Sequence, residues 1–327
     1  MTPLWKKKPA LGIGIGVGLV GALALALRLR RRDPRVVIPD SITPAIFANR
    51  ACDTSRGRIV YHTSGSGEPL VFLHGFYPGA SSYEWSKIYV HYAAGAKVIV
   101  PDLIGFGESE RPPKPLDGDE HVESLAELLR HTATQQQAAV VASGISCQLA
   151  LLLASRHPEL VSRMFLFLPS AFRSSVQRRA FELPSSFLPT LNRIRYRNIT
   201  ANPNFISNWL TSMFANRELI SLENVDVLTS CARQYGASHA ITGFHRNRAT
   251  FAIGTRLPDV HAPVHIVWPE NAPLFPIEEA HTLCSALPCA SFKPLSTSSL
   301  LAPLEHPEML SQDLKIWHNR DPVALAI

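Results

Sequence analysis

Two stretches of the chain decide how the rest is interpreted. Residues 70–76 read Leu-Val-Phe-Leu-His-Gly-Phe, and residues 101–109 read Pro-Asp-Leu-Ile-Gly-Phe-Gly-Glu-Ser. The first is a short apolar run that ends in His-Gly, and a nearly apolar run at 97–101 leads into the second. Short apolar runs followed by turn residues are typical of strands buried on both faces of a parallel sheet. We therefore predict two buried strands, each followed by a glycine-containing loop.

Around these stretches, predicted strands alternate with predicted helices. Further strands are expected at 59–61, 138–142, 164–168, 264–268 and 291–293, and helices at 82–94, 121–132, 145–156, 276–287 and 307–317. This alternation predicts an α/β fold with an open, mostly parallel sheet and helices on both faces. It stops over 169–257, a segment too long for a loop. We divide the body into a core of 57–168 and 258–327 and an insertion of 169–257.

The two stretches resemble the α/β-hydrolase fold family, and the resemblance extends from about residue 57 to the C-terminus. It implies that the insertion is a helical lid over the sheet. It also implies that His74, Gly75 and Phe76 form the oxyanion loop and that the backbone N–H of Ile145 completes the oxyanion hole. Hydrolysis in this family needs a nucleophile, a carboxylate and a histidine, in that chain order.

The three catalytic positions are located by counting from signatures of the family. The nucleophile position falls on Gly144, the acid position after the strand at 264–268 falls on Ala272, and the histidine position, five residues before Glu305, falls on Leu300. None of these residues can act as nucleophile, acid or base. We therefore expect a lost triad and a protein that acts by binding. Its partner would be a hydrophobic small molecule under the lid or a membrane-protein complex.

A second placement of the nucleophile leaves catalysis open. If the turn that carries the nucleophile, the elbow, lies two residues later, Ser146 becomes the nucleophile of an active ester or lipid hydrolase. Gln148 then occupies a position that needs close backbone packing. The five cysteines form no Cys-x-x-Cys pair, and the chain has no His-Glu-x-x-His motif. These patterns predict reduced thiols, no metal site and no cofactor.

The N-terminal part of the chain predicts a membrane anchor. Residues 1–8 are basic, residues 9–27 are 19 residues without a charge, and residues 28–56 form a basic, proline-containing linker. A helix over 9–27 spans roughly 28 Å, the thickness of bilayer hydrocarbon. Because four arginines follow the apolar run, we predict an uncleaved single-pass helix in preference to a cleaved signal peptide. The more basic flank after the helix predicts that the folded domain is cytoplasmic.

Basic residues are concentrated at two places in the chain. The formal net charge is +6, but residues 1–35 hold eight of the 32 basic and one of the 26 acidic residues, which leaves −1 for the body. This balance gives no reason to expect nucleic-acid binding. A second basic cluster begins the lid, and we predict that it contacts the membrane surface. It consists of Arg173, Arg178, Arg179, Arg193, Arg195 and Arg197.

Overall fold

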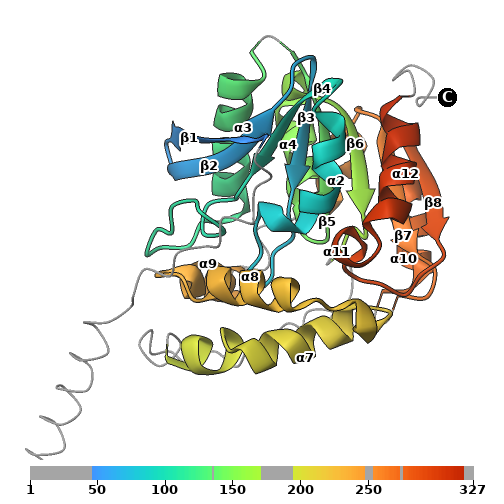
Figure 1. The fold of residues 1–327 in the computed structure, drawn as a ribbon. Coiled ribbons are helices and arrows are strands. Elements are labelled where there is room, and N and C mark those ends of the chain that lie inside the picture. The colour runs from blue at the N-terminus through green and yellow to red at the C-terminus, as the bar shows by residue number, and fades with distance from the viewer. Residues whose placement is uncertain (1–45, 135, 171–193, 247–252, 273–274, 320–327) are drawn as a thin grey trace, which may run out of the picture. The chain divides into compact units, whose positions relative to one another are not determined.

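An eight-stranded sheet forms the centre of the part of the chain that the computed structural model describes, residues 46–134, 136–170, 194–246, 253–272 and 275–319 (Figure 1). Its strand order is β1-β2-β4-β3-β5-β6-β7-β8. β2 is antiparallel to both of its neighbours, and the remaining pairs are parallel. The strands are β1 (Ala48–Thr54), β2 (Gly57–Ser64), β3 (Glu68–Leu73), β4 (Ala96–Pro101), β5 (Ala138–Ser143), β6 (Val161–Phe167), β7 (Val264–Pro269) and β8 (Ala290–Leu295).

The central strands are buried as their apolar sequences predict. Every residue of β5 is buried, and the four apolar residues of β3 have no exposed surface. Helices flank the sheet on both sides (Figure 1). α3 (Gly118–Thr132) packs against α4 (Ser146–Arg156), α2 (Ser86–Tyr89) packs against α12 (Pro307–His318), and α10 (Ile277–Ala286) packs against β7 and β8. Shorter elements are η2 (Ser82–Trp85), η3 (Val90–Tyr92), η4 (Pro158–Leu160) and α11 (Ala302–Glu305).

The insertion contributes helices that lie beyond the carboxyl ends of the strands (Figure 1). These are η5 (Tyr196–Thr200), α7 (Pro203–Met213), η6 (Arg217–Leu219), α8 (Leu222–Ala232), α9 (Ala237–Arg246) and η8 (Gly254–Asp259). α7 turns its apolar side inward, because Ile206 and Leu210 are fully buried. Hydrogen bonds join this lid to the core, among them the Asn224 amide to the Tyr83 hydroxyl at 3.1 Å.

The structure corrects the predicted linker at its C-terminal end. Residues 48–54, assigned from the sequence to the segment 28–56, form β1 and pair antiparallel with β2 from Ala48 opposite Thr63 to Thr54 opposite Gly57. Most side chains of β1 are exposed, since it is the edge strand of the sheet. Without a buried face, the strand has no apolar alternation by which the sequence could reveal it.

The predicted membrane helix at 9–27 lies outside the described residues. In the part of the chain that is described, every helix is too short or too polar to span a bilayer.

Candidate functional site

Gly144 forms the sharp turn between β5 and α4. Its φ is +55°, a conformation that glycine adopts freely and that strains other residues. Its N–H donates to the Phe167 carbonyl at 3.0 Å, and its carbonyl accepts the Ser170 N–H at 3.2 Å, so the turn is fixed to the end of β6. An ideal Cβ on Gly144 would meet one described heavy atom within 4 Å, the Oγ of Ser170 at 3.7 Å. The turn therefore has room for a side chain that glycine does not supply.

Ala272 and Leu300 lie in loops at the same edge of the sheet. Gly144 directly follows β5, Ala272 comes three residues after β7 ends, and Leu300 comes five residues after β8 ends. These strands are parallel and joined through β6, so their carboxyl ends meet at one edge. Ala272 is partly buried, while Leu300 is 8% exposed and donates its N–H to Met213 of the lid at 2.8 Å. The topology thus brings the three predicted positions to one side of the molecule.

The predicted oxyanion loop is held by His74. Its Nε2 accepts the Leu103 N–H at 3.0 Å, so the proton of the neutral ring is on Nδ1, which donates to the Gly75 carbonyl at 2.8 Å. Burial lowers the pKa of His74. The ring is therefore neutral and engaged on both nitrogens. His74 serves the loop as a fixed structural support.

Glu84 is a buried acid at this site that the sequence analysis did not single out. Its carboxylate accepts the Gly75 N–H at 2.7 Å and the Tyr77 hydroxyl at 2.9 Å, and it also accepts the Ser143 hydroxyl. Burial raises the pKa of Glu84, although all three hydrogen bonds favour the ionised form. The Tyr77 ring in turn packs on Trp209 of the lid, with 5.0 Å between ring centroids. One carboxylate therefore links the oxyanion loop, the elbow strand and a lid-facing tyrosine.

Ser146, the alternative nucleophile, begins α4 two residues after the turn. It has no exposed surface, and its hydroxyl donates to the His74 carbonyl. The next residue, Cys147, is also fully buried, and burial raises the pKa of its thiol well above the ordinary value. Both side chains point into the protein, so neither has the exposed position on the turn that a nucleophile of this fold occupies.

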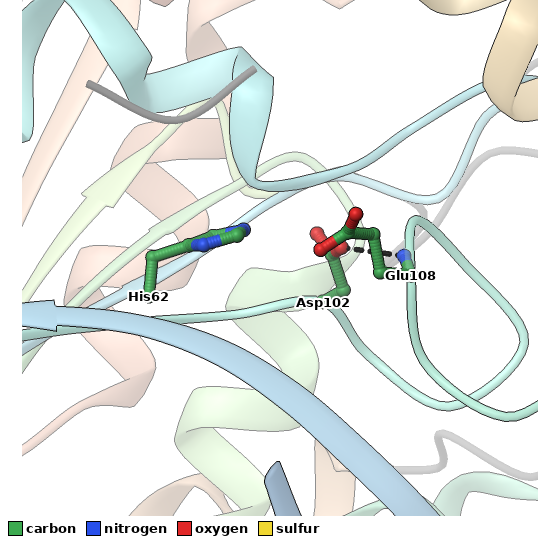
Figure 2. Close-up of side chains that lie close together, drawn as sticks. All are labelled: His62, Asp102 and Glu108. Carbon is green, nitrogen blue, oxygen red and sulfur yellow. Dashed lines mark hydrogen bonds between the residues drawn. The ribbon is translucent and has the colours of Figure 1, made fainter. Parts of the chain in front are cut away.

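His62, Asp102 and Glu108 are the described residues whose spacing would suit a metal ion, because their ligand atoms lie within 4.8 Å of one another (Figure 2). Other contacts account for the two carboxylates. Asp102 accepts the N–H groups of Ser82 and Glu108, each at 2.6 Å, and Glu108 accepts the Asn49 amide at 2.8 Å. The cluster thus fixes the loop that follows β4.

Only part of the basic cluster of the lid lies within the described residues. Arg173, Arg178, Arg179 and Arg193 fall outside them. Arg195 is half-buried, and Arg197 is exposed on η5.

The sheet order, the flanking helices and the strand-turn-helix at Gly144 define the architecture of an α/β hydrolase. The family described as "alpha/beta hydrolase fold" matches residues 68–293, which is more than half of the chain. The chain therefore belongs to the α/β-hydrolase fold family, as the resemblance implied.

Similar proteins in this family are hydrolases of several kinds. The chain is 37% identical over 107 residues to the 2-hydroxymuconate semialdehyde hydrolase of Pseudomonas sp. (strain CF600), 32% of this chain and 38% of that protein. It is 29% identical over 160 residues to the soluble epoxide hydrolase of Corynebacterium sp. (strain C12), 48% of this chain and 51% of that protein. The chain thus spans about half or less of the length of these two relatives. With the uncharacterized hydrolase YugF of Bacillus subtilis (strain 168) it shares 23% identity over 256 residues, 76% of this chain and 88% of that protein.

Solved structures share the fold at low sequence identity. A membrane phospholipase A superposes with a TM-score of 0.69 at 19% identity, covering 93% of this chain and 97% of that one. A serine hydrolase involved in carbazole degradation superposes with a TM-score of 0.70 at 16% identity, covering 84% and 100%. At such identities the likeness concerns the fold alone.

Proposed function

We propose that this protein binds an apolar ligand under its lid and does not hydrolyse it by a catalytic triad. The observation that carries the proposal is Gly144. It has the positive φ and the strand-to-helix position that a nucleophile of this family takes, with no side chain to attack a substrate. A serine held at such an angle is strained by about 1–3 kcal/mol, a cost that glycine avoids.

The acid and base positions support the same conclusion. Ala272 has no carboxylate to orient a histidine, and Leu300 has no imidazole to take a proton. Neither residue adds a charge that would be costly to bury unpaired. His74 is no substitute base, since both of its ring nitrogens are engaged in hydrogen bonds with the backbone, of Gly75 and of Leu103. Ser146 is no substitute nucleophile in this geometry, because its hydroxyl is buried against the His74 carbonyl.

The apolar character of the ligand follows from the residues between lid and core. Trp209 and Met213 of α7 are partly buried against the core, Trp209 packs on Tyr77, and Met213 accepts the Leu300 N–H. A lid that packs apolar side chains such as Trp209 and Met213 against the core favours an apolar ligand.

The proposal includes a single-pass anchor at residues 9–27, which keeps the folded domain at the cytoplasmic membrane surface. The uncharged length of this segment and the arginines after it support this role. The ligand would then be drawn from the lipid phase, or the domain would dock on a membrane-protein complex. In bacterial spheroplasts, the C-terminal domain is expected to resist external protease; cleavage would place it outside.

Activity-based labelling tests the loss of catalysis without knowledge of a substrate. The purified protein is expected to remain unlabelled by a fluorophosphonate and to hydrolyse short acyl esters no faster than buffer. The triple variant Gly144→Ser, Ala272→Asp, Leu300→His is expected to gain label and esterase activity, since the turn has room for the new side chain. Each single variant should gain almost nothing, because the three groups act as a unit.

Ser146→Ala is the matched control. Labelling of the wild-type protein that disappears in Ser146→Ala would overturn the proposal and identify an active hydrolase with a displaced nucleophile. A folded triple variant that stays inert would show that at least one of the three assigned positions is wrong.

A further inference from the structure

Three side chains that could bind a metal ion meet beside the loop that follows β4. His62 lies on β2, Asp102 comes one residue after β4 ends, and Glu108 lies in the loop itself. One ligand atom from each lies within 4.8 Å of the other two, and Figure 2 shows the His62 imidazole pointing toward the carboxylates. Imidazole nitrogens and carboxylate oxygens are ligands that Zn²⁺ takes in proteins. The cluster therefore has the donor set of a zinc site with three protein ligands.

Two of the three side chains are held inside the protein. His62 is 1% exposed and Asp102 is fully buried. Asn49 of β1 is the cross-strand partner of His62, and its amide donates to Glu108 at 2.8 Å, so β1 is also joined to the cluster. An ideal Cβ on Gly107 would lie 2.0 Å from the carboxyl carbon of Asp102, which shows how closely the loop encloses this carboxylate. Ligands that are fixed in advance lose little conformational freedom when an ion binds.

The hydrogen bonds of the two carboxylates leave oxygen lone pairs for an ion. Each oxygen of Asp102 accepts one N–H, from Ser82 or from Glu108, and a carboxylate oxygen has about two lone pairs. On Glu108, Oε2 accepts the Asn49 amide. Each carboxylate can therefore keep its hydrogen bonds while one of its oxygens binds an ion. Such hydrogen bonds orient the ligands of protein metal sites.

The charges at the cluster favour a cation. Asp102 and Glu108 bring two negative charges, and the Arg111 guanidinium, which interacts electrostatically with both, brings one positive charge. Among these three groups, one negative charge remains uncompensated beside a fully buried carboxylate. Buried charges are costly unless they are paired or bind a metal ion. A divalent cation supplies the missing positive charge.

We propose that His62, Asp102 and Glu108 bind one Zn²⁺ ion, with solvent at the fourth position. Glu108 is exposed, so it gives the ion an entry path and can move inward, since ligand atoms on a four-coordinate Zn²⁺ are about 3.3 Å apart. The ion fastens the loop after β4 to β2. That loop carries Gly105, which packs against Ala240 of α9, so the ion also steadies the lid. The site uses none of the triad positions and is independent of the proposed function.

Calorimetric titration of the full chain tests the zinc site. The protein is held in nanodiscs of zwitterionic lipid, stripped of metal with a chelator and titrated with Zn²⁺, and empty nanodiscs are subtracted. About one Zn²⁺ should bind per chain. Mg²⁺ should bind at least about tenfold more weakly, because it prefers oxygen ligands and loses its water reluctantly. Zn²⁺ should also slow hydrogen exchange at the Ser82 and Glu108 amides, which donate to Asp102.

Two variants remove one ligand each. Glu108→Gln and His62→Gln should each weaken Zn²⁺ binding about tenfold or more. Because Glu108 is exposed, Glu108→Gln is expected to fold even if the change at the buried His62 is not tolerated. Glu218→Gln, at an exposed acid of η6, is the matched control and should bind like the wild type. Cys284→Ser with Cys289→Ser removes two half-buried thiols, the rival zinc ligands, and should also leave the affinity unchanged.

The outcomes decide between a zinc site and a cluster of charges that only supports the loop. Weaker Zn²⁺ binding in Glu108→Gln, with both controls unchanged, would support the site. Unchanged affinity in Glu108→Gln, Mg²⁺ binding as tight as that of Zn²⁺, or binding that is lost only with the two cysteines would overturn it. None of these measurements depends on esterase activity, so they leave the fluorophosphonate test of the proposed function unaffected.

Discussion

His121 places an ionisable ring in an apolar position beside the oxyanion loop. It is 4% exposed, its Nδ1 has no hydrogen-bond partner among the described residues, and its ring meets Phe76 edge-on with 5.4 Å between centroids. Burial lowers the pKa of His121 to about 4. Between that value and about 6.5, the ordinary pKa of histidine, the unfolded chain binds a proton that the folded chain does not. The stability contributed by this residue is therefore complete above pH 6.5 and is lost as the pH falls toward 4.

We predict that His121→Phe removes part of the acid sensitivity of the fold. On going from pH 7 to pH 4.5, the wild-type free energy of unfolding should fall by roughly 2 kcal/mol more than that of the variant. Urea unfolding at the two pH values measures the difference. His131→Gln, an exposed histidine of the same helix, should behave like the wild type. Equal acid sensitivity of His121→Phe and the wild type would show that the ring is not buried as a neutral group.

The sequence located some residues of the site and not others for a physical reason. Gly144 was found because a strand, a turn and a helix follow one another along the chain, so counting is enough. Glu84 and Ser170 were missed because their roles depend on contacts with residues distant in sequence: Glu84 meets Ser143 across 59 positions, and Ser170 meets Gly144 across a whole helix and strand. A buried acid in an amphipathic-looking segment gives no local signal. The polar Ser81-Ser82 before it reads as an ordinary turn.

At the level of elements, the end of α7 is attached to the core by one buried carboxylate. Glu305 of α11 accepts the N–H groups of Ala215 at 2.9 Å and of Asn216 at 2.6 Å. Leu300 adds its N–H to the Met213 carbonyl at 2.8 Å. These bonds satisfy backbone groups where α7 ends and tie the lid to the loop that carries the predicted histidine position.

We predict that Glu305→Gln loosens this end of the lid. The amide has one acceptor oxygen where the carboxylate has two, so one lid N–H loses its partner, at about 1–3 kcal/mol. Hydrogen exchange should accelerate at Ala215, Asn216 and Leu300 and stay unchanged in β5. Glu308→Gln, an exposed acid at the start of α12, is the control. Unchanged exchange at all three amides would mean that Glu305 does not hold the lid.

Element prediction from the sequence succeeded where burial gives a long apolar run. β5 and α4 match the expected 138–142 and 145–156 within two residues, because both are largely apolar and largely buried. The helix expected at 82–94 is instead broken into η2, α2 and η3. There the side chains serve long-range contacts: the Trp85 indole donates to the Leu73 carbonyl at 3.0 Å, and Glu84 reaches the site. Tertiary bonding overrode the helical pattern.

For the whole molecule, the uneven distribution of charge along the chain bears on the proposed contact with a membrane. The body beyond residue 35 has a net charge of −1, yet the lid begins with six arginines and a single acid between 169 and 200. The apolar side of α7 does not add to this surface, since it packs inward. Any attraction of the lid to lipid would then be electrostatic, with each Arg near an anionic surface contributing about 1 kcal/mol.

We predict that a chain shortened to begin at Ser41 still binds anionic liposomes at low salt. Without the proposed anchor at 9–27, binding depends on the basic cluster, so it should weaken at high salt, where surface charges are screened within a few ångströms. Changing the six arginines to Gln should abolish cosedimentation, and changing Arg195 and Arg197 alone should reduce it. Arg50→Gln with Arg256→Gln, two exposed arginines outside the basic cluster, is the matched control and should bind like the shortened wild type. If the shortened chain floats free of anionic vesicles at low salt, the cluster faces a protein partner, and the anchor alone holds the domain at the membrane.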